Sequence, residues 1–372
     1  MELNEERRKI QLQALAALEK NDYNGIVILP TGTGKSWVMI EALKNLIDTG
    51  TINNIWYLCN SQDLRDTEFV KELHKWGAGE LEDKITRMCY QTAYKLENEN
   101  VDVVLCDEFD FSLTPEYSKV FTNNNFRYKI LVSATIADDK KKIAKQIGKV
   151  VYRKQLQLIE EDGIVNKSKY HFVQFLMTEK ETEQYFKHNQ RIAKAMQGKS
   201  KTYVKMQVLA RKRFLNNLES SRDACRRLMM HLHKSNDKCK VLIFCESNDQ
   251  ASAICKYTYH SDSEEKDNLI KFQEDEINFL AVCGKVNRGT NITGVNFMIL
   301  ESCNGSETQL TQRLGRGKRL NIDEVLNVYF LVPYYKKDRF TRHTKVLDWI
   351  YDAGRNLNLK DAVFLQIESK KS

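Results

Sequence analysis

The sequence predicts an α/β fold made of two parallel β-sheets, each covered by helices on both faces. Short apolar, β-branched runs alternate with longer runs that carry apolar residues at helical spacing, first through residues 1–150 and again through residues 151–372. With 372 residues, 42% of them hydrophobic and 29% charged, the chain is long enough for two domains with separate cores. We therefore expect domains over 1–150 and 151–372, joined by a short hinge near 150–163.

The first domain contains a regular succession of strand and helix patterns. Its expected strands are 25–29, 54–61, 84–91, 102–110 and 128–135. Helical spacing follows the first two of these strands, over 37–47 and 63–76. Because parallel strands end at one edge of a sheet, we expect the polar motifs at these strand ends to lie together.

The second domain repeats the strand rhythm but contains a long helical excursion over about 179–235. Its expected strands are 169–177, 239–247, 255–261, 278–284, 295–302 and 325–333. The net charge of the chain is +8, yet residues 184–218 alone carry nine Lys or Arg and no Asp or Glu. A local excess of this kind suits a phosphate backbone. The alternative is a solvated basic helix without a ligand.

Composition also bears on the cellular compartment. The sequence has no apolar run of about 18 residues, and its amino terminus is charged where a signal peptide needs an apolar segment. The nine cysteines include no C-x-x-C pair, and most lie inside apolar strands. We therefore expect a protein that stays in the cytoplasm, or in the host cytoplasm if it is viral, and that has no membrane partner.

A glycine-rich turn joins the first strand to the first helix of the strand–helix series. The turn consists of Pro30, Thr31, Gly32, Thr33, Gly34, Lys35 and Ser36. Backbone N–H groups converge at such a junction, and the glycines let the chain wrap around a polyphosphate. Lys35 would then reach the β- and γ-phosphates of ATP, and the Ser36 hydroxyl would ligate Mg²⁺. The alternative is a glycine turn that binds no ligand.

Two carboxylates lie near the carboxyl end of the strand expected at 102–110. Asp107 and Glu108 can divide the work of phosphoryl transfer, one holding Mg²⁺ and the other polarising the attacking water. Downstream of a phosphate-binding turn, this pair favours ATP hydrolysis over a solvated acidic loop.

The segment 309–320 offers a second set of polar groups, three of them arginines. It contains Gln312, Arg313, Arg316 and Arg319 around glycines, and planar guanidinium groups suit the spread charge of a transferring phosphate. We expect this segment to reach the nucleotide from the second domain; the alternative is a basic surface helix.

Together these motifs give the chain a family resemblance. "RRKIQ", "PTGTGKS", "DEFD", "SAT", "VLIFCES", "GKVNRGTNI" and "QRLGRGKR" stand in the order of the motifs of superfamily 2 helicases and translocases. The chain thus resembles a motor with two tandem RecA-like domains and is similar to the phage UvsW-like and type III restriction-motor branch. The resemblance spans residues 8–319.

The resemblance implies a role for individual residues. Arg8 and Gln11 would read adenine. Gln312, Arg316 and Arg319 would complete catalysis with Lys35, Asp107 and Glu108. Ser133 and Thr135 would couple hydrolysis to domain movement. The implied nucleic-acid contacts are Asn60, Gln91, Arg288, Gly289 and Thr290, together with Lys199, Lys201, Lys205, Arg211, Lys212 and Arg213 in the basic excursion.

The function that follows is an ATP-dependent motor that translocates on DNA and unwinds or remodels forked or branched DNA. An RNA helicase is the nearest alternative, because motors that track a backbone contact phosphates and sugars more than bases. A nucleic-acid-binding regulatory or clamp subunit with weak ATPase activity is the alternative from another class. The sequence leaves the oligomeric state open and is compatible with a monomer. We expect specificity to come from the basic excursion, from surface loops or from a protein partner.

Overall fold

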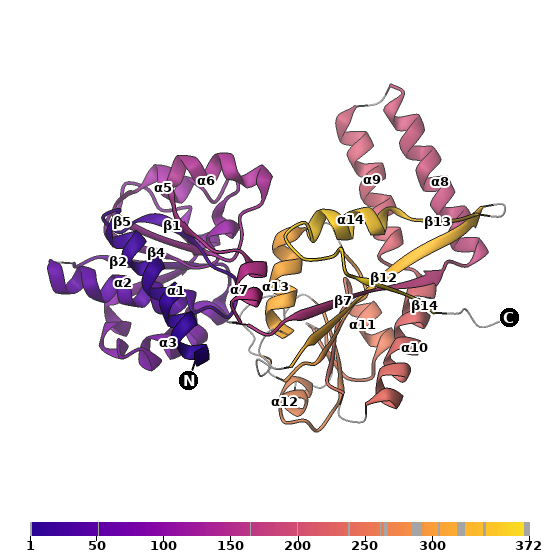
Figure 1. The fold of residues 1–372 in the computed structure, drawn as a ribbon. Coiled ribbons are helices and arrows are strands. Elements are labelled where there is room, and N and C mark those ends of the chain that lie inside the picture. The colour runs from indigo at the N-terminus through magenta and orange to yellow at the C-terminus, as the bar shows by residue number, and fades with distance from the viewer. Residues whose placement is uncertain are drawn as a thin grey trace. The chain divides into compact units, whose positions relative to one another are not determined.

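The computed structural model describes most of the chain. The residues described are 2–50, 52–163, 165–198, 200–236, 239–260, 262–263, 267–283, 292, 294–303, 306–317, 324–337 and 340–367. The chain divides into two compact units, residues 1–165 and 166–372, and each is an α/β unit built on a sheet of mainly parallel strands (Figure 1). The predicted fold class is confirmed. The boundary lies after Val165 instead of at residue 150, because strand β6 (Val150–Arg153) pairs with the first sheet.

The first unit contains a six-stranded parallel sheet in the order β3-β2-β4-β5-β1-β6. Besides β6, its strands are β1 Asn24–Ile28, β2 Ile55–Cys59, β3 Ile85–Cys89, β4 Asn100–Cys106 and β5 Asn125–Ser133. All five expected strands are present. The unpredicted β6 has only four residues, half-buried or exposed, and pairing with β1 is what makes it a strand.

Helices connect the parallel strands of the first unit. They are α1 Glu2–Glu19, α2 Lys35–Thr49, α3 Phe69–Lys75, α4 Tyr90–Ala93, α5 Lys119–Asn123, α6 Lys141–Ile147 and α7 Leu156–Glu161. The helix expected over 63–76 contains a π-helical turn, η1 Leu64–Glu68, before α3. Short 3₁₀ turns complete the unit as η2 Gly79–Lys84, η3 Phe109–Ser112 and η4 Asp138–Lys140.

The second unit is built on a sheet in the order β14-β7-β12-β11-β8-β10-β9, with β13 antiparallel to β12. The strands are β7 Ser168–Leu176, β8 Val241–Phe244, β9 Thr258–Tyr259, β10 Phe279–Val282, β11 Phe297–Leu300, β12 Leu326–Lys337, β13 Phe340–His343 and β14 Val363–Ile367. The six strands predicted here are confirmed as β7 to β12. The sequence did not predict β13 or β14, which lie along the margin of the sheet and are largely exposed.

The described helices of the second unit lie on both sides of this sheet or project from it. They are α8 Glu179–Met196, α9 Lys201–Leu215, α10 Glu219–Ser235, α11 Asn248–Ile254, α12 Asn268–Gln273, α13 Glu307–Gly317 and α14 Lys345–Ala353.

The expected helical excursion over 179–235 has two different parts. Helices α8 and α9 form an antiparallel hairpin that extends away from the sheet of the second unit (Figure 1). Helix α10 instead packs on β7, β12 and β14, and buries Ala224, Cys225, Leu228 and Leu232 at helical spacing. The arm is therefore the α8–α9 hairpin alone, and α10 belongs to the body of the unit.

The base of the arm is held by a buried carboxylate. Thr178 and Glu181 form a reciprocal capping box at the start of α8, and Glu181 is only 8% exposed. The other carboxylate oxygen of Glu181, Oε1, accepts a hydrogen bond from the backbone N–H of Ser220, with 3.1 Å between the two atoms. Glu181 thus ties the first turn of α8 to the first turn of α10, so the hairpin projects from a fixed base.

A second buried carboxylate lies in the interior of the second unit. Glu301 follows β11, is 5% exposed, and accepts hydrogen bonds at Oε1 from Ser221 Oγ at 2.8 Å and Gln250 Nε2 at 3.3 Å. Burial raises the pKa of Glu301 to about 7 and the nearby Glu246 acts in the same direction, whereas Ser221, Arg222 and Arg313 oppose the shift. No described group forms a hydrogen bond with Oε2 of Glu301.

Among the described residues, no helix combines the length and the apolar character needed to cross a bilayer.

We predict that Glu301→Gln stabilises the protein at alkaline pH but not at acidic pH. A carboxyl with a raised pKa binds more protons when folded than when unfolded, so wild-type stability falls as pH rises from about 4.5 to about 7. Above that window the ionised, buried carboxylate costs up to about 3 kcal/mol. Chemical unfolding of both proteins at pH 5 and pH 8 measures the difference. The exposed carboxylate variant Glu274→Gln is the control. An advantage of Glu301→Gln that is equal at both pH values contradicts the prediction.

Candidate nucleotide and nucleic-acid site

The carboxyl ends of neighbouring strands gather the polar motifs of the first unit. Strands β1, β5 and β4 are adjacent and parallel, and they lead into the glycine turn, Ser133 and Asp107 respectively. Strands β2 and β3 continue the same edge and lead into Asn60 and Gln91. The predicted convergence of these motifs at one edge is therefore present.

The glycine turn has a backbone that other residues could adopt only with strain. Gly32 and Gly34 have φ values of 89° and 91°, in the left-handed region. Gly34 is the N-cap of α2 and has no side chain to satisfy the first N–H groups of the helix, which begins at Lys35. Thr33 is fully buried, and its hydroxyl donates to the carbonyl of Pro30 at 2.7 Å. The loop is thus fixed from within while its amide edge suits an anion.

Helix α1 braces this loop through the two residues expected to read adenine. Gln11 is 5% exposed and its Nε2 donates to the carbonyl of Thr33 at 2.9 Å. A Cβ atom at Gly34 would come within 2.1 Å of the same Nε2, so a larger residue would push the Gln11 side chain out of this contact. The guanidinium carbon of Arg8 lies 3.8 Å from the ring centre of Trp37 on α2.

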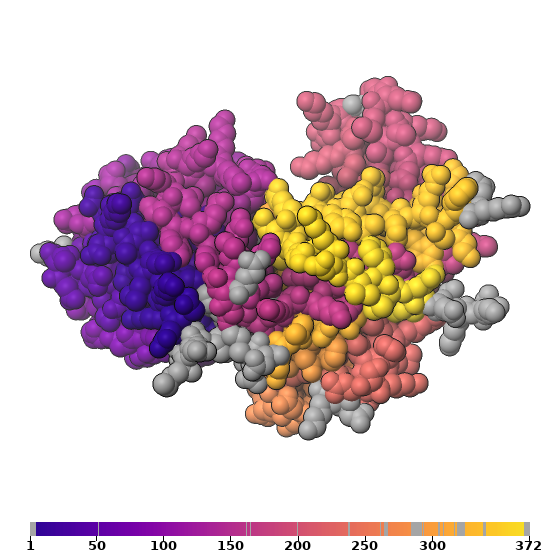
Figure 2. Space-filling model, in the orientation of Figure 1, coloured from indigo at the N-terminus to yellow at the C-terminus, as the bar shows by residue number. Residues whose placement is uncertain are grey.

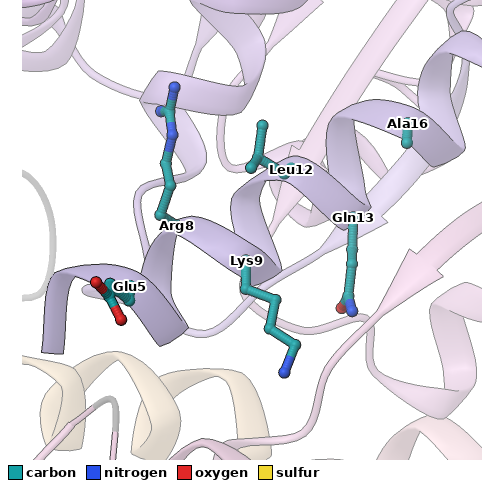
Figure 3. A pocket seen from close by; sticks show the side chains of 6 residues that line it. All are labelled: Glu5, Arg8, Lys9, Leu12, Gln13 and Ala16. Carbon is teal, nitrogen blue, oxygen red and sulfur yellow. The ribbon is translucent and has the colours of Figure 1, made fainter. Parts of the chain in front are cut away.

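An open groove of about 700 Å³ runs along another face of α1. Figure 3 shows its lining, in which Arg8 extends away from Lys9 and Gln13. All the lining residues belong to this one helix: Glu5, Arg8, Lys9, Leu12, Gln13 and Ala16. The groove is a stripe of helix surface that shares Arg8, but not Gln11, with the residues that brace the glycine turn.

The pKa of the Asp107 carboxyl is set by its burial and by the charged and polar groups around it. Burial raises its pKa and Glu108 acts in the same direction, whereas Lys35 and a hydrogen bond from Tyr57 act against the shift. Because the charge of Lys35 lowers the pKa of Asp107, the lysine of the glycine turn and this carboxylate interact electrostatically. A cation at this edge would favour the ionised carboxylate, so the donor set fits Mg²⁺.

The backbone turns sharply at Glu108. Its φ of 47° is in the left-handed region, which a non-glycine residue adopts at a cost. Its N–H donates to Asp107 Oδ1 at 2.8 Å, and Tyr90 Oη donates to the carbonyl of Asp107 at 2.9 Å. These hydrogen bonds hold the end of β4 in the strained turn.

Ser133 contacts a residue that the sequence analysis did not single out. Its hydroxyl lies 3.0 Å from Asp110 Oδ1 and 2.8 Å from the carbonyl oxygen of Thr135. Asp110 is 6% exposed, and Lys140 Nζ donates to its carbonyl at 2.6 Å. The last acid of "DEFD" therefore joins the loop after β4 to the loop after β5. Its place in that motif was the available signal.

Asn60 and Gln91 are brought together as expected for neighbouring strand ends. Gln91 Nε2 donates to the carbonyl of Asn60 at 3.3 Å, and the side chain of Gln91 is exposed. Asn60 is 5% exposed and its Oδ1 forms no hydrogen bond with the described residues. Polar groups at this edge are therefore available to contact the backbone of a nucleic-acid strand.

In the second unit, the structure describes the side chains of Gln312 and Arg313 among the four polar residues singled out in segment 309–320, and these two differ in burial. Gln312 on α13 is half-buried. Arg313 is only 3% exposed, and its Nη1 donates to the carbonyl of Ser302 at 2.9 Å while Nη2 lies 3.5 Å from Glu246 Oε2. Arg313 thus fixes α13 inside its own unit, although the spacing of the segment suggested a reach toward phosphate.

The cations of the arm also separate into two groups. Lys201, Lys205 and Arg213 are exposed on α9. Arg211 is half-buried and donates to Asn189 Oδ1 on α8 at 2.8 Å, and Lys212 Nζ lies 5.6 Å from the ring centre of Trp349. The last two contribute to the packing of the arm as well as to its charge.

Several expected site residues lie outside the residues that the structure describes. They are Lys199, Arg288, Gly289, Thr290 and Arg319, together with the side chain of Arg316.

Comparisons with known proteins agree with this arrangement. Residues 1–138 match the family model "Type III restriction enzyme, res subunit", and residues 221–321 match "Helicase conserved C-terminal domain". The chain is 23% identical to the DNA 3'-5' translocase XPB2 of Sulfurisphaera tokodaii, over 91% of this chain and 84% of that protein.

Solved structures share the fold. S. cerevisiae Dbp5 bound to RNA and ADP BeF3 superposes with a TM-score of 0.60 at 16% identity, over 96% of this chain and 89% of that one. The type ISP restriction-modification enzyme LlaBIII bound to DNA gives 0.65 at 13% identity, over 98% of this chain and 31% of that one. Two helicase models matched in chain order, on a fold shared with these structures, place the chain in superfamily 2 of the ATP-dependent helicases and translocases, with two RecA-like domains.

Proposed function

We propose that this chain couples ATP hydrolysis to translocation on DNA and to the unwinding or remodelling of forked or branched DNA. The observation that carries the proposal is that the left-handed glycine turn with Lys35 and the carboxylate Asp107 lie at the same edge of the first sheet, where Lys35 acts electrostatically on Asp107. The glycine turn follows β1 and Asp107 follows β4, and both strands pair with β5. A phosphate-binding loop and a metal-binding carboxylate at one sheet edge are the parts that phosphoryl transfer requires.

The nucleotide roles are assigned from the motifs that carry these residues and from their positions along this edge. Bound ATP would supply the cleavable phosphate, and Mg²⁺ would supply positive charge that offsets its oxygens. Lys35 and the loop amides would hold the phosphates, Ser36 and Asp107 would hold the metal, and Glu108 would polarise the attacking water. Gln11 would offer its Oε1 to the adenine amine, since its Nε2 already donates to Thr33. Gln312, Arg316 and Arg319 are assigned to catalysis by the motif that contains them.

The contact between Ser133 and Asp110 supports a route for coupling. Asp110 follows Glu108 by two residues, and its hydrogen bond to Ser133 reaches the loop that continues to Thr135. A movement of Glu108 when phosphate leaves would then be transmitted to the end of β5 through the hydrogen bond between the Asp110 and Ser133 side chains.

DNA is favoured over RNA by a relative that is 23% identical over 91% of this chain and is named a DNA translocase. The RNA-bound Dbp5 structure keeps the RNA helicase as the second candidate. ATPase rates measured in parallel with single-stranded DNA, duplex DNA, forked DNA and RNA test the choice. Stimulation by RNA alone refutes the DNA assignment, and no stimulation by any of the four favours the regulatory or clamp subunit.

We predict that Lys35→Ala lowers the ATPase rate by about 100- to 1,000-fold, the usual loss when one donor to a developing charge is removed. The matched control is Lys44→Ala, which changes a lysine on the same helix that pairs with Glu41 at 3.3 Å. Steady-state ATPase assays and thermal unfolding of both variants measure the effect. A Lys35→Ala protein that hydrolyses ATP at the wild-type rate refutes the phosphate-binding assignment.

We predict that changing Lys201, Lys205 and Arg213 together to Gln weakens DNA binding and flattens its salt dependence. Each neutralised phosphate contributes about 0.7 to 0.9 to the slope of log K against log salt, so the slope falls by about 2 to 3. Binding isotherms at several salt concentrations give the slope. The control changes three exposed lysines of the same unit outside the arm, Lys234, Lys256 and Lys360, to Gln. Equal slopes in wild type and arm variant count against an arm that holds phosphates.

A further inference from the structure

The outer surface of the arm carries an apolar stripe that the phosphate-binding role does not use. Tyr203, Met206 and Leu209 on α9 are 43%, 59% and 42% exposed, and their three-residue spacing places them along one side of the helix. Met196, at the end of α8, is 72% exposed.

The stripe turns around α9 relative to α8. The inward side of α9 is marked by Arg211, which donates to Asn189, and by Phe214, whose ring lies 5.2 Å from that of His188. At 100° per residue, Met206 and Leu209 are turned about 140° and 160° from Arg211, whereas Tyr203 is turned only about 20° from Phe214. Met206 and Leu209 therefore lie away from α8, and Tyr203 lies toward α8 but is still 43% exposed. The hairpin stands clear of the body of its unit (Figures 1 and 2).

The charges around the stripe indicate what would cover it. Lys201, Lys205 and Arg213 are exposed beside it, and residues 184–218 contain no acidic side chain. The complementary surface is therefore a polyanion that also offers flat apolar faces. Nucleic acid with accessible bases meets both requirements, because its phosphates are anionic and its bases stack on aromatic side chains.

We propose that the exposed surface formed by Tyr203, Met206 and Leu209 on α9 is a base-stacking subsite for unpaired nucleotides. Tyr203 stacks on a base, Met206 and Leu209 pack against the sugar and base beside it, and Lys201, Lys205 and Arg213 hold the flanking phosphates. This inference rests on the proposed binding of nucleic acid by the arm. Its consequence is that the arm prefers single strands and frayed ends over continuous duplex, with a part of the affinity that does not depend on salt.

The test compares two DNA ligands with the full-length chain. One is a short single-stranded oligothymidine, and the other is a relaxed closed-circular duplex, which has no ends. We expect Tyr203→Ala to weaken oligothymidine binding by about 5- to 100-fold at every salt concentration, the range for loss of one stacked base, with an unchanged salt slope. Affinity for the closed circle should change less than twofold. Tyr203→Phe should restore binding, because it keeps the ring.

Two further variants complete the design. Met206→Ser should weaken oligothymidine binding in the same salt-independent way, whereas Met230→Ser should not, although Met230 is also 58% exposed, on α10. Tyr203→Trp should show fluorescence quenching when oligothymidine is added, as expected for a stacked indole.

Four results overturn the inference. Unchanged oligothymidine affinity in Tyr203→Ala, with a lowered slope in the lysine and arginine variant, removes the stacking subsite and leaves the proposed function intact; no change in either variant removes both. Equal losses on both ligands mean that Tyr203 does not sense unpaired bases. Loss of a self-associated form in Tyr203→Ala, without loss of DNA affinity, assigns the stripe to a second copy of the chain.

Discussion

Parallel pairing of β4, β5 and β1 is the constraint on which the candidate nucleotide site depends. The register that aligns Ile28 with Ser133, and Cys106 with Leu131, brings three strand ends to one edge. Each strand then releases its chain into a different chemical element: a glycine turn, a carboxylate pair and a hydroxyl loop. A shift of register in any one strand would separate these three elements from one another.

Around this edge, buried polar contacts fix the loops without occupying their outward-facing groups. Gln11 and Thr33 hold the glycine turn from behind, and Tyr90 holds the carbonyl of Asp107. Asp110 and Ser133 link the next two loops below the surface. The loop at the start of α2 is therefore held in a rigid frame, and preorganised groups of this kind are what electrostatic catalysis requires.

The second unit uses buried charge differently. Glu181 and Arg313 each hold a helix in place, one at the base of the arm and the other on α13. Glu301 lies between α10 and the end of β11, and burial pushes its titration toward neutral pH. The arm carries its cations and its exposed apolar side chains on a hairpin whose base is held by such contacts, so it can present a defined surface to a partner.

The sequence by itself determined the fold class, eleven of the strands and the chemistry of the first sheet edge. These features depend on local properties: β-branched runs, helical spacing, and glycines that alone adopt the left-handed turn without strain. The succession of superfamily 2 motifs along the chain also indicated, from the sequence alone, the order of the two units.

The tertiary structure alone decided the features that depend on distant contacts. Strands β6 and β14 exist because β1 and β7 offer them a free edge, and neither has a strong pattern of its own. The basic excursion became a hairpin and a packed helix because α10 buries one face on the sheet. Arg313 turned inward because Ser302 and Glu246 are neighbours only in space. Spacing places a side chain on a helix, but the partners that it meets are set by the packing of the whole unit.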